Sequence, residues 1–240
     1  MNSRETKVPE APEGTFATRF WREWLKPLLL VILVMAPFRS SFADWNDVPT
    51  GSMKPTIIEG DRVVVNKLAY DLKVPFTTIH LAQWGDPRRG DIVVLYSPAD
   101  DVRLVKRVIG LPGDTIEMRD DVLFVDGKAA KYEPLSREVI DQVTASERAQ
   151  SVFATEELGT VAHAVMGKPG VETIRSFGPV VVPAKQYFVM GDNRDESYDS
   201  RWLGFIDRKR IVGEAVAVAF SLDREHYFIP RGGRLFRALR

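Results

Sequence analysis

The first candidate for chemistry is Ser52, a serine held in a rigid bend of the segment 48–56, VPTGSMKPT. Gly51 before it and Pro55 after it exclude both a regular helix and a central strand. Ser52 can therefore lie exposed on a fixed turn, with its backbone N–H pointing the same way. A serine hydroxyl is a weak nucleophile and needs a base within hydrogen-bond reach. Without such a base, the segment is typical of an ordinary Gly/Ser/Pro turn.

A candidate base is Lys106, a lysine set in an apolar row. Residues two apart on a strand share a face, which places Lys106 between Leu104 and Val108 on the predicted strand 102–109. Burial disfavours the ammonium form, so we expect the pKa of Lys106 to fall from about 10.4 toward neutrality. A neutral amine is what could take a serine proton. Taken alone, the segment also fits a snorkelling lysine on an edge strand.

The third candidate segment is 191–201, GDNRDESYDSR, which is dense in short polar residues. A calcium-binding loop is excluded because Tyr198 occupies the position of the obligatory glycine. The run is better explained as a loop that satisfies its own hydrogen bonds. Such a loop could pair Asp199 with Arg201 and leave Ser197 to orient a buried amine.

The composition excludes several other chemistries. The chain has no cysteine, which removes disulfides, thiolate metal sites and cysteine nucleophiles. Its three histidines, His80, His163 and His226, have no metal-ligand spacing and give no support to a Ser-His-Asp triad. Lys+Arg and Asp+Glu both number 33, so the overall charge gives no hint of nucleic-acid or acidic partners. We therefore expect no metal, no cofactor and no nucleic acid.

An apolar run at 27–38 follows a polar tail, residues 1–19. The run is shorter than the roughly 20 residues of a membrane-spanning helix. The segment 20–43 would span if Lys26 and Arg39 snorkel toward the head groups. Five Lys or Arg precede the run and only Arg39 follows closely, so the tail is expected to stay cytoplasmic. Tryptophans would then lie at both membrane interfaces: Trp21, Trp24 and Trp45.

Two other interpretations of the segment 20–43 stay open. Its short apolar core is also typical of a buried helix in a soluble protein. Alternatively the segment is a cleavable signal peptide, since Ser41-Phe42-Ala43 fits a small-x-small cleavage site. The charged stretch ahead of the core is long for a signal peptide, which favours a permanent anchor. A mature protein that starts at Asp44 would exclude the anchor.

From Asp44 onward the chain is predicted to be mainly β-structure. Segments rich in Val, Ile, Tyr and Phe are separated by Gly-Asp turns: 61–70, 91–96, 102–109, 180–190 and 212–220. Residues 122–131 predict a hairpin with a type I′ turn at Asp126-Gly127.

The region from about 132 to 176 is more charged and less strand-like, with a candidate helix at 136–150. It interrupts two compact β regions, so we interpret it as part of an inserted subdomain. We place this subdomain at about 118–178 within a domain that covers 44–240.

Taken together, three segments resemble the bacterial type I signal peptidases, also called leader peptidases. The resemblance covers 48–70, 89–117 and 191–205, and an apolar segment precedes it in the expected place. One such motif would be weak evidence, whereas three in the family's order and approximate spacing indicate the family. The motifs are Pro49-Thr50-Gly51-Ser52-Met53, Lys106-Arg107 with Gly110-Leu111-Pro112-Gly113-Asp114, and Gly191-Asp192-Asn193-Arg194-Asp195.

The resemblance implies a role for each matching residue. Ser52 matches the nucleophile and Lys106 the general base of a Ser–Lys dyad. The Ser52 N–H and Thr50 match the oxyanion hole, although serine is commoner at the position of Thr50. Ser197 matches the hydroxyl that hydrogen-bonds the lysine. A supporting ion pair and the shallow apolar pockets for the substrate's P1 and P3 residues match further positions: Asp199 with Arg201, and Val48, Met53, Ile57 and Val105.

The resemblance also implies the fold and the surroundings of the enzyme. We expect a twisted all-β catalytic domain with an inserted subdomain and one N-terminal transmembrane helix, in the bacterial inner membrane. The catalytic domain would face the extracytoplasmic side, contact membrane lipid, act as a monomer and take preprotein signal peptides as substrates.

Three alternatives compete with this assignment. They are a specialised pilus-processing Ser–Lys peptidase, an inactive membrane-tethered β-domain that binds exported peptides, and an autoprotease of the SOS-repressor type. The last would need a DNA-binding domain that residues 1–43 cannot supply.

Overall fold

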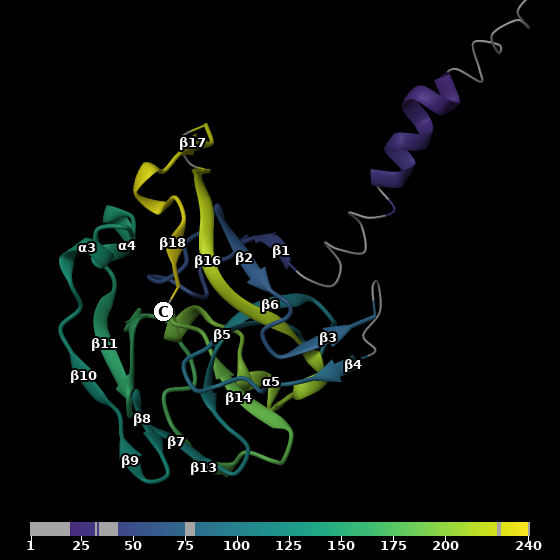
Figure 1. Ribbon diagram of the computed structural model, residues 1–240. Helices are drawn as coiled ribbons and strands as arrows, with labels where there is room; N and C mark the ends of the chain where they lie inside the picture. Colours follow the sequence, from purple (N-terminus) through teal and green to yellow (C-terminus); the bar gives the residue numbers. More distant parts are fainter. Residues whose placement is uncertain (1–19, 32, 34–42, 75–79, 225–226, 240) are drawn as a thin grey trace, which may run out of the picture.

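The computed structural model describes residues 20–31, 33, 43–74, 80–224 and 227–239. Within this part, the chain forms one large and three smaller sheets whose strand pairs are antiparallel (Figure 1). The prediction of a mainly β fold is confirmed. Three predictions lie wholly or partly outside the described residues: the tail 1–19, the segment 32–42 apart from Leu33, and His226.

The large sheet contains Lys106 and the two strands that precede and follow Ser52 in the sequence. Its longest strand, β16, curves across the domain between β2 and β5 (Figure 1). In β2, buried positions alternate with half-buried ones, as expected for a strand with one face toward a core. The order along the sheet is β1 (Ala43–Asp47), β2 (Asp61–Asn66), β16 (Ile211–Asp223), β5 (Ile92–Tyr96), β6 (Arg103–Gly110), β14 (Gln186–Met190) and β15 (Ile206–Asp207), while β17 (Ile229–Pro230) and β18 (Arg237–Ala238) also pair with β16.

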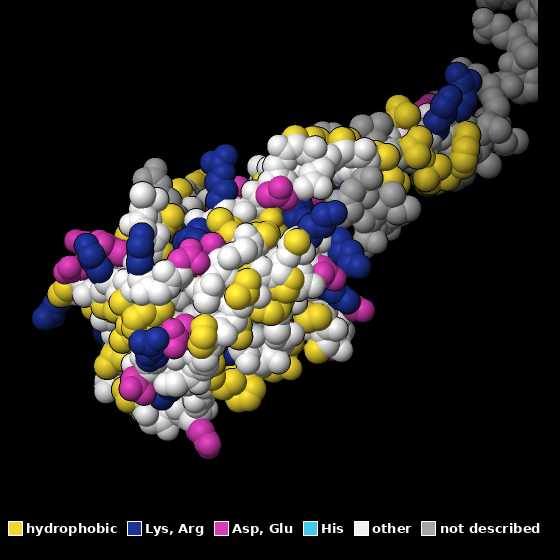
Figure 2. All heavy atoms as spheres, turned by 90° about the horizontal axis from the view of Figure 1, so that it is seen from below, with side chains coloured by type: hydrophobic (Ala, Val, Ile, Leu, Met, Phe, Trp, Pro, Cys, Tyr) yellow, Lys and Arg dark blue, Asp and Glu magenta, His cyan; other side chains and the backbone are white. Residues whose placement is uncertain are grey.

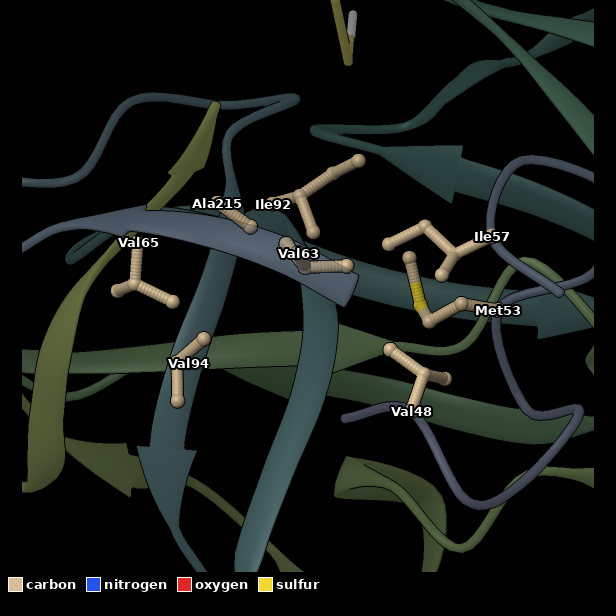
Figure 3. Close-up of a cluster of buried hydrophobic side chains, with 8 residues drawn as sticks. All are labelled: Val48, Met53, Ile57, Val63, Val65, Ile92, Val94 and Ala215. Atoms are coloured by element: carbon tan, nitrogen blue, oxygen red, sulfur yellow. The ribbon is translucent and has the colours of Figure 1, made fainter. Parts of the chain in front are cut away.

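A buried apolar cluster packs against this sheet next to Ser52 (Figure 3). Strand side chains such as Val63 and Val94 are fully buried there. Met53 and Ile57, which follow Ser52 in sequence, point into the same cluster (Figure 3). Burying a side chain of this size is worth roughly 1.5–3 kcal/mol, so the core itself anchors the turn that carries Ser52.

The inserted region forms two small sheets and two short helices. The hairpin of strands β8 and β9 turns at Asp126-Gly127, where φ is +51° and +74°, so the predicted positive φ values of a type I′ turn are confirmed. The candidate helix at 136–150 is two short helices, α3 (Arg137–Ile140) and α4 (Ala145–Arg148). The strands are β7 (Thr115–Arg119), β8 (Val122–Val125), β9 (Lys128–Ala129) and β13 (Phe177–Val181) in one sheet, and β10 (Lys131–Glu133), β11 (Val152–Leu158) and β12 (Val161–Gly167) in the other.

The remaining elements are short. A two-stranded sheet joins β3 (Asp71–Lys73) to β4 (His80–Gln83). The helical turns after β14 lie beside the candidate site. These are η2 (Arg194–Glu196) and α5 (Ser200–Leu203), and two further helical turns follow, η3 (Arg208–Arg210) and η4 (Gly232–Arg234).

The predicted anchor segment begins with helical backbone. A π-helical turn, η1 (Trp21–Leu25), is followed by α-helical residues up to Val31. Hydrophobic side chains lie exposed along this helix, including Trp24 at 70% and Leu30 at 61% exposure (Figure 2). None of the helices in the described part of the chain is long and apolar enough to cross a membrane.

Candidate active site

Ser52 lies in the tight turn that connects β1 with β2. Two buried side chains hold one side of this turn, Met53 at 1% and Ile57 at 0% exposure. Asn193, from the loop after β14, holds the other side. Its backbone N–H donates to Ser52 O at 3.1 Å, and its Nδ2 donates to Gly51 O at 3.2 Å. The turn is therefore fixed between the core and a second loop.

Lys106 reaches Ser52 from strand β6. Its Nζ is hydrogen-bonded to Ser52 Oγ at 2.7 Å, although the two residues are far apart in sequence. The Lys106 side chain is only 2% exposed. Burial lowers the pKa of Lys106 to about 8, while the negative charges of Asp199 and Asp192 limit the fall and the positive charge of Arg201 adds to it. The amine can therefore be neutral near physiological pH.

The register of the sheet explains why Lys106 is buried. It pairs across the strands with Val93, which is fully buried. Leu104 and Val108, on either side of Lys106 in the same row, pack in the same apolar cluster as Val93. The predicted apolar row around Lys106 is confirmed.

The next residue on β6, Arg107, forms a fully buried ion pair with Asp192. Its Nε and Nη2 donate to the two carboxylate oxygens at 2.8 and 2.7 Å, and its Nη1 donates to Gly90 O at 2.8 Å. Burial alone would raise the pKa of Asp192, but the Arg107 guanidinium outweighs it and lowers that pKa. Removing one partner of such a pair costs roughly 3–5 kcal/mol. The pair ties β6 to the loop that holds Ser52.

A second buried pair joins Asp199 and Arg201. Arg201 Nε and Nη2 each lie 2.9 Å from a carboxylate oxygen of Asp199, and both side chains are fully buried. Asp199 also caps α5 by accepting from Arg201 N at 3.2 Å, and it accepts from Gly191 N at 3.0 Å. Burial would raise the pKa of Asp199, but the hydrogen bonds and charge of Arg201 lower it. The carboxylate is therefore a fixed negative charge near Lys106.

Gly191 lies where the Ser52 turn and the loop after β14 approach most closely. A Cβ at this position would lie 2.6 Å from Ser197 Cβ and far inside van der Waals contact of both Ser52 O and Ser197 Oγ. Only glycine fits without moving the backbone of Ser52. This role follows from close packing, because Gly191 does not have a positive φ.

Ser197 is buried beside Gly191, at 7% exposure. Its hydroxyl lies near enough to Asp199 to help lower the pKa of that carboxylate. It makes no hydrogen bond of normal geometry to any other residue in the described part of the chain, Lys106 included. The hydrogen bond from Ser197 to Lys106 stays a prediction of the resemblance.

The structure places the other predicted site residues around Ser52. Thr50 is exposed, two residues before Ser52. Val48, Met53 and Ile57 are buried in the cluster of Figure 3, and Val105 packs against it while partly exposed. The four apolar residues therefore belong to or border one core cluster beneath the turn, and their contact with substrate stays a prediction.

The roles of Gly191 and Asn193 were not predicted from the sequence. Gly191 stands in a Gly-Asp pair, which the sequence pattern indicates as a turn. Asn193 and the Arg107–Asp192 pair join segments distant in sequence, so local spacing carries no signal for them. Their presence inside two of the three family motifs is the only sequence signal that could have pointed to them.

Metal-binding groups are not evident among the described ranges. No group of three or more His, Asp or Glu side chains there could hold a metal ion. His163 is buried beside Glu156, with Nε2 at 3.4 Å from Glu156 Oε1. Burial lowers the pKa of His163 although Glu156 opposes the shift, so this histidine is a neutral core residue.

Comparison with known proteins identifies the class to which this fold and site belong. The family described as signal peptidase, peptidase S26, matches residues 21–220. The chain therefore belongs to the signal peptidase family.

Two sequence relatives agree with this assignment. Signal peptidase I of Pseudomonas fluorescens is 37% identical over 207 residues, which cover 81% of this chain and 70% of the relative. Signal peptidase I P of Bacillus subtilis subsp. natto is 38% identical over 203 residues, covering 84% and 90%. A solved signal peptidase I from Enterococcus faecalis V583 is 36% identical, with a TM-score of 0.33 over 54% of this chain and 96% of that chain.

Proposed function

We propose that this chain cleaves signal peptides from exported preproteins with Ser52 as nucleophile and Lys106 as general base. Membership of the signal peptidase family makes it a serine endopeptidase that acts on signal peptides. The observation that supports the dyad most directly is the 2.7 Å contact between Lys106 Nζ and Ser52 Oγ. A lysine that is buried and has a pKa of about 8 can serve as the base for a neighbouring hydroxyl.

The chemistry follows from the positions of these groups. Neutral Lys106 takes the Ser52 proton while Oγ attacks the scissile carbonyl carbon, which gives a tetrahedral oxyanion. The protonated Lys106 then gives that proton to the leaving amine, the C–N bond breaks and an acyl-enzyme remains. Lys106 next takes a proton from water, which attacks the ester, and Ser52 regains its hydrogen as the signal peptide leaves.

The oxyanion hole is proposed to consist of the Ser52 N–H and the Thr50 hydroxyl. Within the described residues, the Ser52 N–H donates to no acceptor and Thr50 makes no side-chain hydrogen bond. Both donors are therefore available for a developing negative charge. Removing one such donor typically costs about 2.7–4 kcal/mol of transition-state stabilisation. Asp199 and Arg201 are proposed to support the site by fixing Gly191 and the electrostatic field at Lys106.

The domain organisation proposed from the sequence completes this function. Residues 1–19 would form a cytoplasmic tail, 20–43 a transmembrane anchor, and 44–240 an extracytoplasmic catalytic domain with an inserted subdomain at about 118–178. The exposed apolar side chains on the helical part of this segment support an anchor. A monomer that touches membrane lipid would then meet preproteins at the membrane surface.

The direct test is cleavage of a detergent-solubilised preprotein by the wild type and by Ser52→Ala, with sequencing of all products. We expect the wild type to release the mature protein and Ser52→Ala to cut nothing, because no other hydroxyl is hydrogen-bonded to Lys106 in the described part of the chain. Cleavage by Ser52→Ala would refute Ser52 as nucleophile. Sequencing the enzyme itself tests the anchor, which a mature start at Asp44 would exclude.

Activity should increase with pH through about 8. The base acts only as the neutral amine, and a folded-state pKa of about 8 leaves roughly one tenth of Lys106 neutral at pH 7. The value of kcat/KM is therefore expected to rise nearly tenfold per pH unit below pH 7 and to level off above pH 8. A profile measured from pH 5.5 to 9.5 checks this; a flat profile across that range would exclude Lys106 as the titrating base.

A further inference from the structure

The inserted subdomain reaches the nucleophile turn through one side chain of α4. Lys54, two residues after Ser52, is 7% exposed. Its Nζ donates to Glu147 Oε1 and Oε2 at 2.8 and 3.0 Å, and lies 2.7 Å from Glu59 Oε2. Burial lowers the pKa of Lys54, but the bonds to Glu147 and Glu59 outweigh it and raise that pKa, so the lysine stays charged. An ion pair therefore links the two parts of the chain beside Ser52.

The contact continues around the turn through a second lysine. Lys168, which follows β12 of the inserted subdomain, lies 3.7 Å from Glu147 Oε1 and 2.6 Å from Glu196 Oε2. Glu196 in turn accepts from Asn193 Nδ2 at 3.0 Å. The same Nδ2 donates to Gly51 O, immediately before Ser52. These successive contacts form a path that begins at Lys54 and returns through Asn193 to Gly51, so both of its ends lie in the Ser52 turn.

Lys54 and Glu59 also pack against Gly51 in the turn itself. A Cβ on Gly51 would lie 3.0 Å from Lys54 Cε and 2.6 Å from Glu59 Oε1. The stem of Lys54 and the carboxylate of Glu59 therefore cover Gly51 directly. The position of Lys54 relative to Glu147 therefore bears on the packing of the backbone next to Ser52.

The local structure of α4 turns Glu147 toward Lys54. Thr144 and Glu147 have the spacing of a capping box, in which the glutamate would bond the backbone N–H of the capping residue. The helix start has no such side-chain cap bond. The Thr144 hydroxyl instead donates to Glu147 Oε2 at 3.1 Å, which leaves the carboxylate directed at Lys54. Helix α4 lies in the connection between the paired strands β10 and β11, at one end of this pair (Figure 1).

We propose that Lys54, Glu147, Lys168 and Glu196 form a clasp by which the inserted subdomain holds the Ser52 turn in its reactive geometry. Glu147 is the positioning residue of this clasp, because its carboxylate contacts Lys54 in the turn segment and lies near Lys168 of its own subdomain. The inference rests on the proposed Ser52–Lys106 chemistry and adds a role for the inserted subdomain. It predicts an effect on the rate of the chemical step, since none of the four residues belongs to the apolar surface expected to bind substrate.

The test compares Glu147→Gln with the wild type in steady-state cleavage of a preprotein and in thermal unfolding. Glutamine keeps the shape and one acceptor but removes the charge, and Lys54 keeps its ion pair with Glu59, so the variant is expected to fold. A displacement of the nucleophile by a fraction of an ångström reduces turnover strongly. We expect kcat to fall about tenfold, KM to change less than twofold, and the unfolding midpoint to stay close to that of the wild type.

Two lysine variants separate charge from packing. Lys54→Met keeps the stem over Gly51 and is expected to lose about as much kcat as Glu147→Gln. Lys54→Arg keeps the charge and is expected to stay within about threefold of wild-type kcat. The larger guanidinium has room, because Lys54 borders a cavity of about 450 Å³. The double variant with Lys54→Met and Glu147→Gln should lose little more than either single variant, since both break one link.

The matched control is Asp141→Asn, which removes the exposed pair between Asp141 and Arg148 beside the same helix. It should leave kcat unchanged. Wild-type kcat in Glu147→Gln, or an equal loss in Asp141→Asn, would overturn the clasp. Either result leaves the proposed function intact as long as the wild type cleaves and Ser52→Ala does not; failure of that pair of reactions would refute the peptidase chemistry instead.

Discussion

Replacing Lys106 by arginine is expected to abolish preprotein cleavage, with kcat falling by about 10⁴-fold or more. Arginine retains the positive charge of the side chain but stays protonated throughout the pH range of a folded protein. It therefore cannot take the proton of Ser52, to which the wild-type amine is hydrogen-bonded at 2.7 Å. Single-turnover cleavage at pH 9, where most wild-type Lys106 is neutral, gives the largest contrast between the two enzymes.

A partly buried lysine away from the site supplies the control for this substitution. Lys73 on β3 also has a pKa lowered by burial, and its Nζ donates to the backbone oxygens of Ile211 and Val212. Lys73→Arg makes the same chemical change away from Ser52 and should retain cleavage. Unfolding midpoints of both variants show whether the larger guanidinium disturbs the fold. Cleavage by folded Lys106→Arg at more than about 1% of the wild-type rate would contradict the assignment of Lys106 as base.

The position of Lys106 was predictable because a strand has a fixed side-chain period. Once 102–109 is assigned as a strand, Lys106 must share a face with Leu104 and Val108, and the structure places all three in or beside one apolar cluster. The predicted strand segment 180–190 is instead divided between β13 and β14, which lie in different sheets. The other predicted strands and the hairpin turn at Asp126-Gly127 were predictable for a similar reason. Each depends on residues close together in sequence, whose backbone preferences act locally.

Contacts between distant segments were not predictable from spacing. The sequence indicated that Ser52 and Lys106 belong to one site only through the family resemblance, because no periodicity relates residues on different strands. The same holds for the bond from Asn193 to Gly51 O and for the link from Glu147 to Lys54. Nothing in the sequence of the charged region at 132–176 indicated that the carboxylate of Glu147 lies beside the Ser52 turn.

The inserted subdomain and the loop after β14 both contact the segment that carries Ser52. Asn193 donates to the backbone oxygens of both Gly51 and Ser52, while the Arg107–Asp192 pair holds the same loop against β6. Ser52 and Lys106 are thus each attached to one short loop. That loop therefore helps to set the position of Ser52 relative to Lys106.

Gly191→Ala is therefore expected to have the second-largest effect, a loss of about 10²-fold in kcat together with lower stability. A methyl group at this position would overlap Ser52 O, which is backbone, and Ser197 Oγ, which is buried. The turn must move to accept it, and a displacement of about 1 Å at a reacting group costs on the order of 10²-fold in rate. Overpacking of this kind also costs roughly 1–3 kcal/mol of stability. Cleavage kinetics and denaturant unfolding measure the two effects separately.

Gly170→Ala is the matched control, since no atom lies within 4 Å of a Cβ added there. It should leave both kcat and stability close to wild type. If Gly191→Ala cleaves as fast as Gly170→Ala, the turn can move without affecting the dyad, and close packing at Gly191 does not position Ser52. A loss of stability in Gly191→Ala with unchanged kcat would lead to the same conclusion. A fall in kcat measured well below the unfolding midpoint would instead show that the close approach of the Gly191 backbone to Ser52 O fixes the position of Ser52.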